Sequence, residues 1–156
     1  MDELHESYGG ICAYLCVYIE RCTGGVSTDH FVAKSKTAGL AYEWSNYRLA
    51  CATMNARKRD FEDVLDPFAL EPDTFRLELV TGHIYPNPHL SSPALARAQQ
   101  TIDRLDLDDD GCRELRSRKF RDYVRVRGSE ANPMLEQQFR RDTPFVWLEA
   151  SRQGLL

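Results

Sequence analysis

The ordered set Asp29-His30, Asn46 and Asn55 is the feature of this sequence that most limits how the chain can fold. A carboxylate and an amide oxygen suit a hard cation such as Mg²⁺, which takes oxygen ligands and keeps several water molecules. A histidine is the natural general base, because its unperturbed pKa lies near neutrality. Hydrolysis of a phosphodiester bond needs such a base, and it needs neutralisation of the charge that builds on phosphorus. The fold must therefore bring these side chains together from one short stretch of chain.

The sequence around this set predicts a short strand, a polar loop and a helix. Residues 26–32 follow a Gly24-Gly25 turn and are expected to form the strand that carries the Asp-His pair. From Trp44 the pattern turns helical. This helix is expected to end at Asp66-Pro67, because the residue before a proline is biased away from helical geometry. Residues 2–7 are a further candidate for a short helix.

The second half of the chain is predicted to be mainly helical. Residues 75–80 alternate between apolar and polar side chains, which fits a strand, and the proline-rich run 86–93 is typical of a linker. A helix is expected over residues 95–105, where apolar residues recur at helical spacing, and another after Gly111. The apolar segment 145–148 is expected to pack on the body of the protein.

Composition narrows the class of protein. The chain has 156 residues, of which 42% are hydrophobic and 28% charged, and these values suit a globular protein. We predict an α+β fold with a small core over residues 1–66 and a mainly helical extension over residues 67–156. The extension is expected to pack on the core or on a partner. No apolar run approaches the roughly 20 residues that span a bilayer, and no secretory leader opens the chain, so we expect a cytoplasmic protein without a membrane partner.

Three segments, VSTDHF, WSNYRL and CATMNARK, resemble the HNH (ββα-metal) endonuclease family. The likeness implies a ββα-metal core, in which His30 is the general base and Asp29 and Asn55 are ligands of Mg²⁺ or Mn²⁺. It implies that Asn46 fixes the loop by hydrogen bonds to the loop backbone. It also implies that the Asp-His pair lies on the second strand of a hairpin, and that Asn55 lies on the helix after it.

Each of these residues also has a simpler interpretation. An Asp-His pair on a strand is usually a hydrogen-bonded pair of the surface or core. Asn46 after Ser45 fits a helix N-cap, and Asn55 fits a solvent-facing position on a helix. Their common order and spacing, together with Lys58 after Asn55, favour the nuclease interpretation over these separate ones.

The cysteines depart from the pattern of that family. Many members brace the core with a zinc ion held by two Cys-x-x-Cys pairs. Here the first pair is stretched to Cys12 and Cys16, and the second has Met54 in place of the thiolate expected after Cys51. A thioether is a poor zinc ligand, and Cys22 fits no familiar spacing. We therefore expect a core without structural zinc, in which Met54 packs against the thiols.

Basic residues are expected to contact a phosphate backbone even though the net charge is −4, because phosphate contacts are local. The expected contacts are Lys34, Lys36, Arg57, Lys58, Arg59, Arg116 and Lys119. The alternative is that these clusters are solvated helix faces. DNA is the leading substrate. An RNase that uses the same site, and a catalytically weak adaptor that binds nucleic acid, remain the alternatives.

The extension is more weakly similar to the HNH proteins of bacterial anti-phage defence of the retron and Septu types. This likeness rests on short motifs, namely an Ala-rich helix with Thr101-Ile102-Asp103-Arg104-Leu105 and an Arg-rich helix after it. It implies a nuclease of antiviral defence that works beside an ATPase subunit, which binds the nuclease and controls cleavage.

Overall fold

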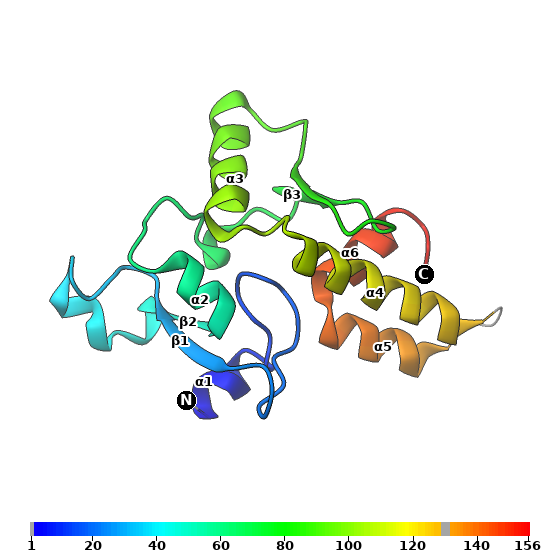
Figure 1. Ribbon diagram of the computed structural model, residues 1–156, viewed down its shortest axis with the longest axis horizontal. Coiled ribbons are helices and arrows are strands. Elements are labelled where there is room, and N and C mark those ends of the chain that lie inside the picture. Colours follow the sequence, from blue (N-terminus) through cyan, green and yellow to red (C-terminus); the bar gives the residue numbers. More distant parts are fainter. Residues whose placement is uncertain (1, 129–131) are drawn as a thin grey trace.

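The structure of the chain, a computed structural model, describes residues 2–128 and 132–156. Over these residues it is an α+β fold with six α-helices and two small antiparallel sheets (Figure 1). The helices are α1 (Asp2–Ser7), α2 (Ala52–Lys58), α3 (Ser92–Leu105), α4 (Asp110–Arg127), α5 (Pro133–Asp142) and α6 (Pro144–Arg152), and the strands are β1 (Val26–His30), β2 (Tyr47–Cys51), β3 (Phe75–Leu77) and β4 (Ile84–Pro86). None of the described helices has the length and apolar character needed to cross a bilayer. The predicted α+β class is confirmed.

A ββα unit forms the first half of the fold. β1 and β2 pair antiparallel, with Val26 opposite Cys51 and His30 opposite Tyr47. Helix α2 begins at the residue after β2 and packs on both strands and on α3. The loop between the strands holds two short 3-10 turns, of which the second ends at Asn46.

Two of the sequence expectations for this unit are wrong. The segment after Trp44 is not helical at first: it enters β2, and the helix runs only from Ala52 to Lys58. Leu49 and Ala50 are both fully buried, so the segment lacks the alternation by which a half-buried strand is recognised. The second wrong expectation concerns the Asp-His pair, which lies on β1, the first strand of the hairpin, and not on the second.

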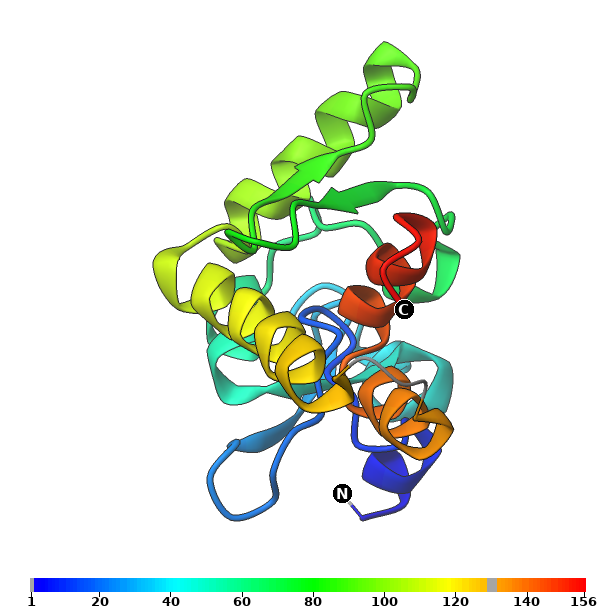
Figure 2. The same ribbon diagram turned by 90° about the vertical axis from the view of Figure 1, so that its right-hand side faces the viewer.

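The second half of the fold matches its prediction more closely. The helices expected over residues 95–105 and after Gly111 are α3 and α4, and α4 begins at Asp110. The strand expected over residues 75–80 is shorter, because the chain turns back and pairs β3 with β4. Strand β4 ends within the run that the sequence indicated as a linker, and Pro86 is its last residue. Figure 2 shows this second hairpin lying beside α3.

The loop of residues 8–25 between α1 and β1, called the N-terminal loop below, connects the two halves. It closes on itself through a bridge between Ile11 and Tyr18, and it lies between α2 and the helices α4–α6 (Figure 1). The Ala13 amide donates to the Leu49 carbonyl oxygen in β2, and the Tyr18 amide donates to the Asp142 carbonyl oxygen in α5. One continuous apolar cluster therefore runs from the ββα unit into the extension. Its members include Cys12, Leu49, Met54, Leu77, Ile102, Leu105 and Val146.

Candidate active site

Asp29 lies near the end of β1 and points into the protein, where its side chain is 3% exposed. The hydroxyl of Tyr14 donates a hydrogen bond to Asp29 Oδ2. The Nζ atom of Lys58 lies 3.4 Å from the same oxygen. Burial and the charge of Asp29 raise the pKa of Tyr14, so its hydroxyl keeps the proton that it donates. The carboxylate is thus held by two groups, one neutral and one cationic.

Lys58 is the most completely enclosed cation beside this site. Its side chain has no exposed surface, and its Nζ atom donates to the carbonyl oxygens of His30 at 3.2 Å and of Phe31 at 3.0 Å. A buried ammonium persists only with such partners, because an unpaired charge is costly to bury. The predicted phosphate contact is therefore wrong for Lys58, which holds the end of α2 against the end of β1.

His30 points to the opposite face of β1 from Asp29, as successive residues of a strand do. Its Nε2 atom lies 3.1 Å from the carbonyl oxygen of Ala41, and its ring meets the ring of Tyr47 edge-on at 5.0 Å between centroids. A carbonyl oxygen only accepts hydrogen bonds, so Nε2 carries the proton of the neutral ring. Nδ1 is then the basic nitrogen, and the loop that contains Ala41 fixes its orientation.

Asn46 makes the hydrogen bonds expected of a residue that ties the loop. It is buried, and its Oδ1 accepts from the Val32 amide at 2.8 Å. Its Nδ2 donates to the carbonyl oxygens of Val32 at 3.0 Å and of Leu40 at 3.1 Å. These three bonds close the loop immediately after His30, so Asn46 acts on the histidine through the loop backbone.

Asn55 lies on α2 and faces β1. Its Nδ2 donates to Ser27 Oγ at 3.2 Å, while its Oδ1 accepts no hydrogen bond from the described residues. Ser27 and Asp29 are two residues apart on the strand and share a face. Asn55 and Lys58 are three residues apart on the helix and also share a face. Two contacts therefore join the same faces of α2 and β1: Asn55 binds Ser27, and one helical turn later Lys58 pairs with Asp29.

The Asp29 carboxylate and the Asn55 amide oxygen fit Mg²⁺ or Mn²⁺ by donor type, since both are hard oxygen ligands. The free Oδ1 of Asn55 supports this fit. Lys58 opposes it, because its ammonium competes for the Asp29 oxygen. Among residues 2–128 and 132–156, no cluster of three or more His, Cys, Asp or Glu side chains is arranged to hold a metal ion. An ion at Asp29 and Asn55 would accordingly take its other ligands from water or substrate.

The cysteines form a thiol pair beside α2. Cys12 Sγ donates to Cys51 Sγ at 3.9 Å and accepts from the amides of Leu15 and Cys51 at 3.5 and 3.4 Å. The hydrogen bond from Cys12 lowers the pKa of Cys51 to about 6. Met54 is buried in the same apolar cluster as Cys12, as expected.

The predicted phosphate contacts divide by burial. Arg116 is 2% exposed and donates to the carbonyl oxygens of Gly82 and Leu107, so its assignment as a phosphate contact is wrong. Arg57 is paired with Asp109 and joins α2 to the turn between α3 and α4, which leaves it a structural role. Besides Arg57, which is 25% exposed, the predicted contacts with side chains that reach solvent are Lys34, Lys36, Arg59 and Lys119, and Lys36 is paired with Glu62 at 3.2 Å.

Tyr14 is a residue of the candidate site that the sequence did not indicate. It stands between Cys12 and Cys16, in a segment whose spacing drew attention to zinc and not to hydrogen bonding. Nothing in the local pattern marks a tyrosine as the partner of a carboxylate in a distant strand.

No protein-family model and no curated protein matches the chain.

Proposed function

We propose that this chain is a metal-dependent HNH endonuclease that hydrolyses phosphodiester bonds in DNA. The observation that supports this proposal best is the set of three hydrogen bonds by which Asn46 closes the loop after His30. A loop closed in this way holds a basic histidine nitrogen at the end of β1. Helix α2 packs on β1 and carries at Asn55 an amide oxygen that accepts no hydrogen bond from the described residues, on the strand face of Asp29 and not of His30.

His30 is the general base in this proposal. Its Nδ1 takes a proton from the attacking water, while the Ala41 carbonyl oxygen keeps the ring in the required tautomer. Asp29 and Asn55 would hold Mg²⁺ or Mn²⁺, which neutralises the charge that develops on the phosphate when it is bound. In the loop after β1, the exposed Lys34 presents a cation for the phosphate backbone, and Lys36 would do so by exchanging its exposed pair with Glu62 for a phosphate.

The proposal extends to a cellular role. The weaker likeness of the extension to nucleases of anti-phage defence suggests that the chain serves such a system, with an ATPase subunit as its partner. This extension depends on the short motifs alone, and the endonuclease proposal does not require it.

The test is a cleavage assay with matched histidine variants. Wild type, His30→Ala and His89→Ala are incubated with supercoiled plasmid and with structured RNA, each with Mg²⁺ and with EDTA. His89 is exposed and lies outside the site, so it controls for the loss of any histidine. We expect plasmid cleavage by wild type and His89→Ala that EDTA abolishes, and a loss of about 100-fold or more in His30→Ala.

Other results would redirect the proposal. Equal cleavage by wild type and His30→Ala would show that His30 is not the base. Cleavage of RNA alone would identify an RNase that uses the same site. Salt-dependent binding of both substrates without cleavage would identify an adaptor, for which the Lys58–Asp29 ion pair would be the structural reason.

A further inference from the structure

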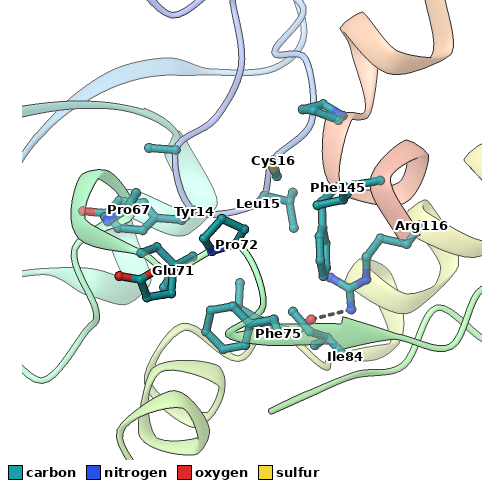
Figure 3. Close-up of a pocket in the computed structure, with 15 residues that line it drawn as sticks. Tyr14, Leu15, Cys16, Pro67, Glu71, Pro72, Phe75, Ile84, Arg116 and Phe145 are labelled. Atoms are coloured by element: carbon teal, nitrogen blue, oxygen red, sulfur yellow. Dashed lines mark hydrogen bonds between the residues drawn. The ribbon is translucent and has the colours of Figure 1, made fainter. Parts of the chain in front are cut away.

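A cavity of about 270 Å³ lies between the N-terminal loop, the segment before β3, and helices α4 and α6 (Figure 3). Apolar side chains form most of its wall, among them Leu15, Phe75 and Phe145. It is larger than the roughly 150 Å³ that accommodates a benzene molecule in a protein core. The cavity can therefore hold one aromatic ring with a short substituent.

Arg116 is the only cationic side chain among the residues that line this cavity. Its Nε atom donates to the Gly82 carbonyl oxygen at 2.8 Å, and its Nη2 atom donates to the Leu107 carbonyl oxygen at 2.7 Å. Its Nη1 atom donates no hydrogen bond to any residue that the structure describes. One face of a buried guanidinium thus remains without a partner at the wall of an apolar cavity.

Among the described residues, one carboxylate forms an ion pair with this guanidinium, and that pair is long. It belongs to Asp108, whose Oδ1 lies 4.0 Å from Arg116 Nη2 and also accepts from the Ile84 amide. Asp108 Oδ2 is bound by Arg113 and His83. The acidic residue of the cavity wall, Glu71, lies at the opposite end from Arg116 (Figure 3).

A structural role accounts for only two of the three nitrogens of the Arg116 guanidinium. The bonds to Gly82 and Leu107 brace the β3–β4 turn and the α3–α4 turn, and they use two of the three nitrogens. The third nitrogen, Nη1, has no acceptor among the described residues, and an anion that reaches it would form a charge-assisted hydrogen bond. A carboxylate suits this position better than a phosphate, because a monoanion is cheaper to bring into an apolar cavity than a dianion.

We propose that this cavity binds a small monocarboxylic acid with one aromatic ring. The carboxylate accepts a hydrogen bond from Arg116 Nη1, and the ring lies among Leu15, Phe75 and Phe145. Tyr14 lines the same cavity and donates to Asp29, so an occupant touches the side chain that holds the candidate catalytic carboxylate. Binding at the cavity does not depend on the endonuclease proposal, and the two are tested separately.

The experiment is a calorimetric titration of the purified chain, once with 3-phenylpropionate and once with 3-phenylpropanol. The two probes share the ring and the chain and differ in the charged group. We expect the acid to bind at least about 10-fold more tightly than the alcohol, which corresponds to about 1.4 kcal/mol. Arg116→Gln is expected to abolish this difference.

A second variant keeps the test decisive if Arg116→Gln fails to fold. Ala13→Leu adds bulk to a residue of the cavity wall and leaves Arg116 in place, whereas Ala96→Leu makes the same change on the exposed surface of α3. We expect Ala13→Leu to weaken binding of the acid at least about 10-fold and Ala96→Leu to leave it unchanged. Equal affinities for acid and alcohol, or no binding of either probe up to about 10 mM, would overturn the proposal and leave Arg116 as a structural brace.

Discussion

Replacement of Lys58 by methionine tests whether the buried ammonium is the main support of Asp29. Methionine is of similar length and apolar, so Lys58→Met keeps much of the packing of the side chain and removes only its charge and its donors. The Asp29 carboxylate, which is 3% exposed, would then retain the Tyr14 hydroxyl as its one partner among the contacts described above. The carbonyl oxygens of His30 and Phe31 would lose a donor as well.

The expected cost follows from the geometry. Two unit charges 3.4 Å apart attract each other by about 5 kcal/mol at an effective dielectric constant of about 20. Removal of one partner from a buried ion pair typically costs about 3–5 kcal/mol, because the other charge stays buried. We therefore expect Lys58→Met to lower the free energy of unfolding by about 3–5 kcal/mol, a large share of the roughly 5–15 kcal/mol of a typical domain.

The assay is urea unfolding of four proteins, followed by circular dichroism: wild type, Lys58→Met, Asp29→Asn and the double variant. The amide that Asp29→Asn introduces is neutral and needs no counterion, so the double variant should be more stable than Lys58→Met by at least about 1 kcal/mol. The reasoning is refuted if Lys58→Met unfolds within about 1 kcal/mol of wild type. It is also refuted if the two single effects simply add, since groups in contact should couple.

Three further predictions concern other parts of the fold. Gly82 has a φ of +75°, and a Cβ atom there would lie 2.0 Å from the Arg113 carbonyl oxygen, so Gly82→Ala should lower the unfolding free energy by roughly 2 kcal/mol or more in urea melts. Burial raises the pKa of Asp108, but the Arg113 guanidinium and its other donors outweigh burial and lower that pKa to about 2. The stabilisation by this carboxylate is then full above about pH 4 and is lost as the pH falls through 2, so Asp108→Asn should cost about 1–2 kcal/mol at pH 7 and little at pH 2. The pKa of Cys51 is lowered to about 6 by the hydrogen bond from Cys12, so alkylation by iodoacetamide should rise with a midpoint near pH 6, and Cys51→Ser should remove that phase.

The helices of the extension could be predicted from the sequence because their signal is local. Residues from Ala98 to Leu105 recur at helical spacing on one face, and that face is the one that α3 buries. Asp109 stands before α4, and its side chain accepts from the Cys112 amide as an N-cap does. Such signals depend on residues a few positions apart, and so they are visible without the fold.

The cluster Arg57-Lys58-Arg59 shows what could not be predicted. Three adjacent cations look alike in the sequence, yet Arg57 is paired with Asp109, Lys58 is fully buried and Arg59 is exposed. Their roles are set by the carboxylates that other elements bring beside them. The same reason applies to Arg116, whose helix is packed so that the guanidinium enters the interior. Burial of a charge depends on long-range partners, which a local pattern does not encode.

Polar side chains at three positions anchor helix α2. Asn55 joins it to Ser27 in β1, Lys58 joins its last turn to the carbonyl oxygens of His30 and Phe31, and Arg57 joins it to the turn after α3. The cysteine pattern of the sequence does not indicate what holds Asn55 in place. In the structure, the side chains of Asn55, Arg57 and Lys58 hold the helix in place.

The buried charges around Asp29 already balance. Lys58 lies against Asp29, and Arg48, which is opposite Asp29 in the β-ladder, forms a bidentate pair with Asp66 at 2.8–3.0 Å. Two carboxylates and two cations leave no net negative charge to attract a divalent ion, and charges in a buried region are poorly screened. A phosphodiester would add the missing negative charge. On the endonuclease proposal, the free chain should therefore hold Mg²⁺ weakly, and nucleic acid should strengthen that affinity, because substrate and ion each supply the charge that the other needs.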